Sequence, residues 1–175
     1  MGALADSEFI DGHIAGFPKV LGCIDGTHVQ IKPPKDQEHL YRDRKGLYTI
    51  NVQAICDSEG AINQLTSKWP GSTHDSFIWA DCGSGYALEP WLLTPVRSPV
   101  GPANEQYNSA HTRMRQVIER TFGVLKRRFR CLHQSRGALQ YSPLMCTKIG
   151  VACAMLHNMC VRQGIDFNFP DGTPL

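Results

Sequence analysis

Long apolar runs and paired cysteines are both missing from this sequence of 175 residues. No apolar run approaches the ~20 residues that a membrane-spanning helix needs, so we expect no membrane contact. Residues 1–11 hold neither a basic nor a strongly apolar segment, so we expect no secretory signal. The seven cysteines form no C-x-x-C pair and their number is odd, which argues against a disulfide framework. We therefore expect mainly buried free thiols in a reducing compartment, such as Cys23, Cys56 and Cys153.

A strong net charge is missing too, because the formal charge is only +2. Between residues 106 and 136, however, eight basic residues accompany a single acid, Glu119. Such a stripe can bind the phosphates of a nucleic acid, but a solvated helix face gives the same pattern. The eight basic residues are Arg113, Arg115, Arg120, Lys126, Arg127, Arg128, Arg130 and Arg136.

Three strands are expected in the first part of the chain. The apolar run at 20–24 predicts a buried strand. Alternation of apolar and polar side chains over 48–56 predicts a half-buried strand. A turn sequence at 57–60 and a further run at 61–69 predict the second half of a hairpin, which the Trp-Pro-Gly sequence ends.

Two long helices are expected in the second part. Residues 83–106 are rich in glycine and proline and predict an irregular segment. A long helix follows from Asn108, and Ser142-Pro143 is typical of the start of another. Strands followed by helices indicate a single α/β or α+β domain with layered packing. The side chains expected to point inward are Val117, Ile118, Phe122, Leu125 and Phe129 on the first helix, and Met145, Ile149, Ala152, Cys153, Leu156 and Cys160 on the second.

Three acidic residues on these elements are candidates for a common site, although each has a purely structural alternative. Asp25 precedes a glycine after an apolar run, which is typical of a type I′ hairpin turn. Asp75 fits the spacing of a helix capping box with Ser72. Glu119 can form an ion pair with Arg115, which lies one helical turn away.

Together the three acids indicate metal chemistry. An acid at a strand end, one at a helix start and one on a later helix can converge on one point. Two-metal cleavage of phosphodiester bonds needs such convergence, because carboxylates hold two cations ~4 Å apart. A ligand set made only of oxygen suits Mg²⁺ or Mn²⁺. The basic residues around Glu119 would then contact the nucleic-acid backbone.

The sequence also resembles the PIF/Harbinger transposases and the nucleases derived from them, over residues 17–165. The motifs that carry this resemblance are VLGCIDGTH at 20–28, RKG at 44–46 with INVQ at 50–53, WPGS at 69–72 with HDS at 74–76, VIERTFG at 117–123, RFRCL at 128–132, GALQYSP at 137–143 and LHN at 156–158. The resemblance implies a ribonuclease H-like core, with a mixed sheet flanked by helices, over 17–165. We expect a short extension at 1–16 and a loose tail at 166–175.

The family's function is carried over as an expectation. The resemblance implies a DNA endonuclease in which Asp25, Asp75 and Glu119 are the catalytic residues and bind Mg²⁺ or Mn²⁺. It further implies a Myb-like DNA-binding partner protein and a place in the nucleus, with the cytoplasm as the alternative.

Two departures from the family pattern shape this expectation. The helical, DNA-binding-type region that precedes the first aspartate in the family is expected to be missing. Residues 76–84 also leave no room for a strand that ends in Gly-Asp, so Gly83 stands where a fourth carboxylate belongs, and Asp81 is offset by two residues. We therefore predict a truncated core without one internal strand, and weak or no cleavage. The alternative is a catalytically inactive protein that binds DNA or acts as an adaptor.

Overall fold

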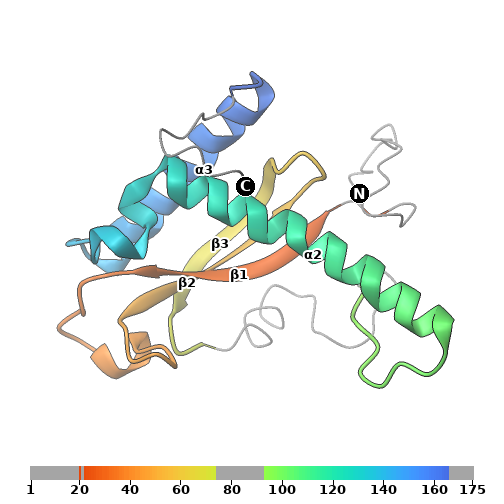
Figure 1. Cartoon of the computed structure of the whole chain (residues 1–175). Coiled ribbons are helices and arrows are strands. Elements are labelled where there is room, and N and C mark those ends of the chain that lie inside the picture. The colour runs from red at the N-terminus through yellow and green to blue at the C-terminus, as the bar shows by residue number, and fades with distance from the viewer. Residues whose placement is uncertain (1–19, 21, 74–92, 166–175) are drawn as a thin grey trace, which may run out of the picture.

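The structure, a computed structural model, describes residues 20, 22–73 and 93–165. In these ranges the elements follow the order β1 (Cys23–Gln30), η1 (Glu38–Tyr41), β2 (Thr49–Cys56), β3 (Ile62–Pro70), α2 (Pro102–Arg128), η2 (Arg130–Leu132), η3 (Gln134–Arg136) and α3 (Pro143–Arg162). The three strands pair in the order β1-β2-β3, and both pairs are antiparallel. Helix α2 runs along β1, and α3 packs against β3 (Figure 1). The α+β class is confirmed, while the described strands form an antiparallel rather than a mixed sheet.

The hairpin of β2 and β3 agrees with its prediction. One carboxylate oxygen of Asp57 accepts hydrogen bonds from the backbone N–H of Glu59 and of Ala61, at 3.0 and 2.9 Å. Gly60 takes a φ of 84°, which a side chain would disfavour. The turn at 57–60 therefore forms from its own sequence.

Gly71 ends β3, as the Trp-Pro-Gly sequence predicts. Its backbone N–H donates to the carbonyl oxygen of Thr49 at 2.8 Å. A Cβ atom at this position would lie 2.7 Å from that oxygen and 2.8 Å from the carbonyl oxygen of Tyr41. Only glycine fits between these two segments of backbone.

The prediction that β2 is half-buried is wrong. Its polar residues Thr49, Asn51 and Gln53 are as buried as its apolar ones, so both faces of this central strand are covered. The hydroxyl of Thr49 bonds to Nδ1 of His28 at 2.9 Å, and Asn51 donates to the carbonyl of Thr73 at 3.2 Å. These hydrogen bonds offset the cost of removing polar side chains from water.

Strand β1 extends beyond its predicted end. It continues through Asp25 and Gly26, which lie opposite Ala54 and Gln53 of β2. The hairpin-turn alternative for Asp25 is therefore wrong, and Asp25 stands within the strand rather than at its end. The reason is the partner, since β2 offers a hydrogen-bonding edge along the full length of β1.

Helix α2 begins earlier than Asn108, within the segment predicted to be irregular. Gly101 has a φ of 80°, and Pro102 stands in the first helical turn, where its missing N–H costs nothing. The expected apolar stripe is mostly confirmed, with Phe129 just beyond the helix end and packed, like Val117, against the core. The buried side chains are Met114, Ile118, Thr121, Phe122 and Leu125.

Helix α3 begins as predicted but presents a different face to the sheet. The hydroxyl of Ser142 accepts the backbone N–H of Met145 at 3.4 Å, which caps the helix. Met145 and Leu156, expected inside, are 45% and 49% exposed. The helix is apolar on several sides, so its pattern cannot select one face. Its buried residues are Cys146, Gly150, Cys153, Ala154 and His157.

Polar side chains attach α3 to the hairpin. The amide of Asn158 accepts from the N–H of Ile62 and donates to its carbonyl oxygen, both at 2.7 Å. The hydroxyl of Thr147 donates to the carbonyl of Ser67 at 2.6 Å. These hydrogen bonds explain which face of α3 meets the sheet better than apolar patterning does.

By length and composition, α3 is also the one helix in the described ranges that could cross a bilayer, with a mean hydropathy of 1.4. Helix α3 therefore departs from the expectation that no apolar stretch is long enough to span a membrane.

The expectation of buried free thiols is confirmed for four of the described cysteines. Cys23, Cys56, Cys146 and Cys153 are buried and unpaired, whereas Cys131 is exposed. Burial raises the pKa of Cys23 to about 11 and that of Cys153 to about 12. These thiols therefore stay protonated and unreactive near neutral pH.

Candidate metal centre

Asp25 projects from β1 toward α2 and is held in one orientation. Its Oδ1 atom accepts the backbone N–H of Gly26 at 2.9 Å. Its Oδ2 atom lies 3.4 Å from Nε of Arg115 on α2. The side chain is 24% exposed, so the carboxylate can still reach solvent or a ligand.

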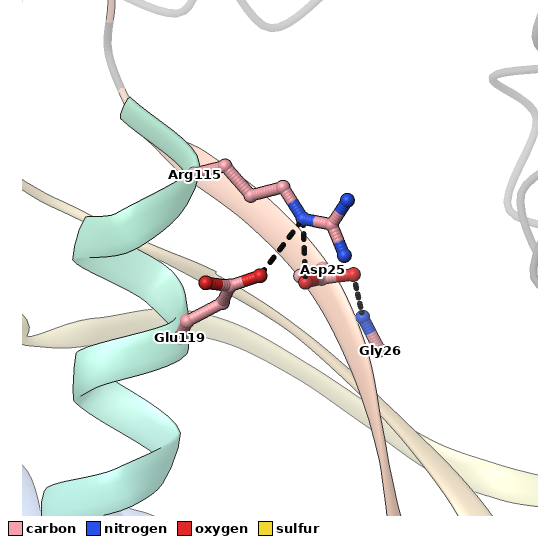
Figure 2. A network of polar contacts seen from close by, with 4 residues as sticks. All are labelled: Asp25, Gly26, Arg115 and Glu119. Carbon is pink, nitrogen blue, oxygen red and sulfur yellow. Dashed lines mark hydrogen bonds and ion pairs between the residues drawn. The ribbon is translucent and has the colours of Figure 1, made fainter. Parts of the chain in front are cut away.

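Glu119 meets the same arginine from the other side. Its Oε1 atom lies 3.1 Å from Nε of Arg115, and the two residues stand four positions apart on α2. Figure 2 shows both carboxylates turned toward this one guanidinium, one from the strand and one from the helix. The structure therefore brings Asp25 and Glu119 together, as predicted. The ion pair proposed as the structural alternative for Glu119 is also present.

The third predicted acid, Asp75, lies outside the described residues, as do Asp81 and Gly83. Within the described ranges, no group of three or more His, Cys, Asp or Glu residues could hold a metal ion. The described part of the centre is thus a pair of carboxylates around a single positive charge.

Lys126 fixes the spacing between the helix and the strand that carry this pair. Its ammonium group donates to the hydroxyl of Thr27 at 2.7 Å and to the carbonyl of His28 at 2.9 Å. Burial, aided by the charge of Lys45, lowers the pKa of Lys126. The sequence assigned this lysine to a phosphate-binding stripe, and the structure shows that it also binds β1.

Replacing Lys126 by methionine should lower the free energy of unfolding by about 1–3 kcal/mol, because two oxygen atoms of β1 lose a charged donor. Urea unfolding followed by circular dichroism measures this change. Lys148→Met, on the exposed side of α3, is the matched control and should have little effect. An equal loss in both variants would contradict the described role of Lys126.

Arg128 is a second member of the basic stripe with a structural role. Its guanidinium donates to Nδ1 of His157 at 3.1 Å and to the carbonyl of Ile165 at 3.0 Å. With Nδ1 accepting, the other ring nitrogen of His157 donates to the carbonyl of Gly60 at 2.9 Å. Burial lowers the pKa of His157, so the neutral ring joins α2, α3 and the hairpin. The stripe therefore serves partly to hold the fold and partly as charged surface. Its exposed members are Arg113, Arg115, Arg120, Arg130 and Arg136.

The sequence predicts only one of the two contacts of Arg115 in this site. The spacing of four residues predicted its contact with Glu119. Its contact with Asp25 depends on how α2 docks on β1, which no local pattern encodes. Two acids from distant segments of the sequence thus meet at one cationic side chain.

Comparison with known proteins defines the class to which this centre belongs. Residues 24–84 and 83–158 match the family described as DDE superfamily endonuclease. The chain belongs to this family.

Individual relatives agree with this assignment. A Homo sapiens protein named "Putative nuclease HARBI1" is 39% identical over 171 residues, which cover 87% of this chain and 49% of the human protein. Its Xenopus laevis counterpart is 36% identical over 172 residues, covering 88% and 50%. An Arabidopsis thaliana protein named "Antagonist of like heterochromatin protein 1" is 24% identical over 183 residues, covering 85% and 46%. The chain spans about half the length of the curated relatives it matches, and no solved structure matches it significantly.

Proposed function

We propose that this chain is the nuclease domain of a metal-dependent DNA endonuclease, occupying residues 17–165. The observation that carries the proposal is the meeting of Asp25 and Glu119 at a single nitrogen atom of Arg115, within 3.4 Å. Two carboxylates from separate elements, focused on one positive charge, form a site that favours cations. Membership of the DDE superfamily endonuclease family supports the same reading.

The residues present fit a hard divalent cation. The donors are carboxylate oxygens only, and they already surround a cationic group. Asp25 and Glu119 would hold Mg²⁺ or Mn²⁺, and we assign Asp75 as the third ligand. Such an ion lowers the pKa of bound water and stabilises charge on the leaving oxygen.

The chain's own residues set the geometry of this centre. The Gly26 N–H fixes the Asp25 carboxylate, and Lys126 fixes α2 against β1, which keeps Glu119 opposite Asp25. Exposed arginines on and after α2, including Arg120 and Arg130, would bind the phosphates that flank the bond to be cut. Positioning of this kind contributes strongly to rate, since small displacements of reacting groups are costly.

We further propose that the domain is a ribonuclease H-like core that lacks one internal strand. The family matches in two stretches, and these meet at residues 83 and 84, where the strand is expected to be missing. The alignment with the human relative spans 171 residues but includes only 87% of this 175-residue chain, so it opens gaps on the side of this chain. With Gly83 in place of a fourth carboxylate, we expect slow cleavage.

A cleavage assay tests the nuclease proposal. Purified protein is incubated with plasmid DNA and Mn²⁺ or Mg²⁺, and nicked and linear products are quantified over time. Asp25→Asn should abolish cleavage, because one metal ligand is lost. Asp36→Asn is the matched control, since it removes the same charge from an exposed loop residue and should leave cleavage unchanged. Equal cleavage by wild type and Asp25→Asn would contradict the proposal.

The second candidate function is a DNA-binding adaptor that no longer cuts, and the exposed arginines favour it. It predicts binding to DNA that weakens steeply with salt and survives Asp25→Asn. In the assay above, DNA binding without cleavage in any variant would select this reading. For either function we propose a nuclear location and a Myb-like partner protein; the name of the Arabidopsis relative refers to heterochromatin.

A further inference from the structure

We propose that the side chain of Arg115 competes with a divalent ion for the carboxylates of Asp25 and Glu119. Arg115 stays bound to these carboxylates until a nucleic-acid phosphate binds its guanidinium group instead. The inference rests on the proposed function and adds to it a means of coupling metal binding to substrate binding. Arg115 would act through its contacts with Asp25 and Glu119 and would not itself bind the metal.

The geometry places the guanidinium where a cation would bind. Nε of Arg115 lies 3.4 Å from Oδ2 of Asp25 and 3.1 Å from Oε1 of Glu119. A divalent ion bound to the same two oxygens would stand about 2.0–2.6 Å from each of them. Figure 2 shows Nε facing both carboxylates, while the rest of the guanidinium points away from them. An ion on these two oxygens would lie close to the positive charge of Arg115, so the two cations would compete for the same carboxylates.

Arg115 can move at small cost. Its side chain is 59% exposed, and that of Glu119 is 52% exposed. Ion pairs with this much access to water contribute little to stability. The two contacts are thus strong enough to weaken metal binding measurably, yet weak enough to break when a better ligand for arginine arrives.

A phosphate group is such a ligand. The planar guanidinium binds phosphate oxygens through paired hydrogen bonds, which are stronger than a single contact from Nε to a carboxylate. DNA whose bond to be cut lies at Asp25 and Glu119 would bring a phosphate close to Arg115, which contacts both acids. Its release would then leave Asp25 and Glu119 free for the ion, so metal and DNA would each increase affinity for the other.

Metal affinity without DNA gives the first test, with Mn²⁺ alone as the probe. Isothermal titration calorimetry on Arg115→Gln should show Mn²⁺ binding about three- to tenfold tighter than for the wild type, because the competing charge is gone. Arg97→Gln is the matched control, since it removes the same charge from an exposed residue outside α2 and leaves the Arg115 contacts intact. It should change the affinity less than twofold. An equal increase in Mn²⁺ affinity in both variants would show that only the net charge of the protein matters, and it would overturn the inference.

Weaker Mn²⁺ binding by Arg115→Gln than by the wild type would also overturn the inference. If Arg115 mainly held the carboxylates in place for the metal, Arg115→Gln would weaken Mn²⁺ binding. No Mn²⁺ binding by the wild type or by Arg115→Gln would instead contradict the proposed function itself. Equal affinity of wild type and variant would contradict only the competition.

The affinity for DNA gives the second test. A short fluorescent duplex is titrated with protein, with and without Mn²⁺ at constant ionic strength, and the anisotropy gives the dissociation constant. Mn²⁺ should tighten DNA binding more in the wild type than in Arg115→Gln, because only the wild type has an arginine to exchange between carboxylates and phosphates. The same Mn²⁺ effect in both proteins would refute the coupling.

Discussion

Replacing Asp25 by asparagine and Glu119 by glutamine in one variant should weaken Mn²⁺ binding by on the order of a hundredfold. Loss of a partner that only supports a ligand already costs about 10–100-fold in metal affinity, and here two ligands lose their charge. The described site has no further acid that could replace them. Isothermal titration calorimetry on the purified proteins measures the change directly.

The control for this experiment removes two acids that lie away from the centre. Asp36→Asn combined with Glu105→Gln has the same change in net charge, and both positions are exposed. Mn²⁺ affinity in that variant should stay within about twofold of the wild type, because exposed charges at a distance are screened. A loss of similar size in both double variants would mean that Mn²⁺ binds by general attraction, and the assignment of Asp25 and Glu119 would fail.

The second large effect is expected from Ile118, which α2 buries completely against the sheet. Its exposed fraction is 0%, and it belongs to the core cluster that joins the strands to both helices. Ile118→Ala should lower the free energy of unfolding by about 2–5 kcal/mol, because buried surface is lost and a cavity remains. Urea unfolding followed by circular dichroism gives the value.

Gln116→Ala is the matched control, since it shortens an exposed side chain on the same helix. It should change stability by less than about 0.5 kcal/mol. Ile118→Ala should also weaken Mn²⁺ binding, because a loosened α2 no longer holds Glu119 opposite Asp25. A stability loss below about 1 kcal/mol for Ile118→Ala would show that α2 does not pack on β1 as described.

Elements with strong local signals could be predicted from the sequence. The turn at 57–60 carries its own aspartate and glycine, and Ser142-Pro143 caps α3 without help from elsewhere. Both follow from hydrogen bonds between near neighbours. The class of the fold then followed from the order of strands and helices.

Features that depend on distant partners could not be predicted in this way. The sequence predicts too early an end for β1, because Asp25-Gly26 is locally typical of a turn, while β2 supplies the hydrogen bonds that continue the strand. The face of α3 was misplaced because the helix is apolar on several sides. Contacts of Asn158 and Thr147 with β3 select the face, and these lie 96 and 80 residues apart in the sequence.

The candidate site, too, could be predicted from the sequence only in part. The residue types and their order indicated a carboxylate centre, and the structure brings Asp25 and Glu119 to one nitrogen atom of Arg115. The role of Lys126 in holding α2 to β1 was missed, because a lysine in a basic run does not reveal which member turns inward. Only the packing of the helix on the strand decides that.

The docking of α2 on β1 also determines when the centre can first exist. Lys126 and Thr27, which join the two elements, are 99 residues apart in the sequence, whereas the β2–β3 hairpin closes within a few residues. Contacts between such distant segments form late, because a long loop must first be closed at an entropic cost. On the ribosome, the hairpin can fold while α2 is still inside the exit tunnel. A nascent chain would therefore stay incapable of binding the ion until α2 has left the tunnel and docked on β1.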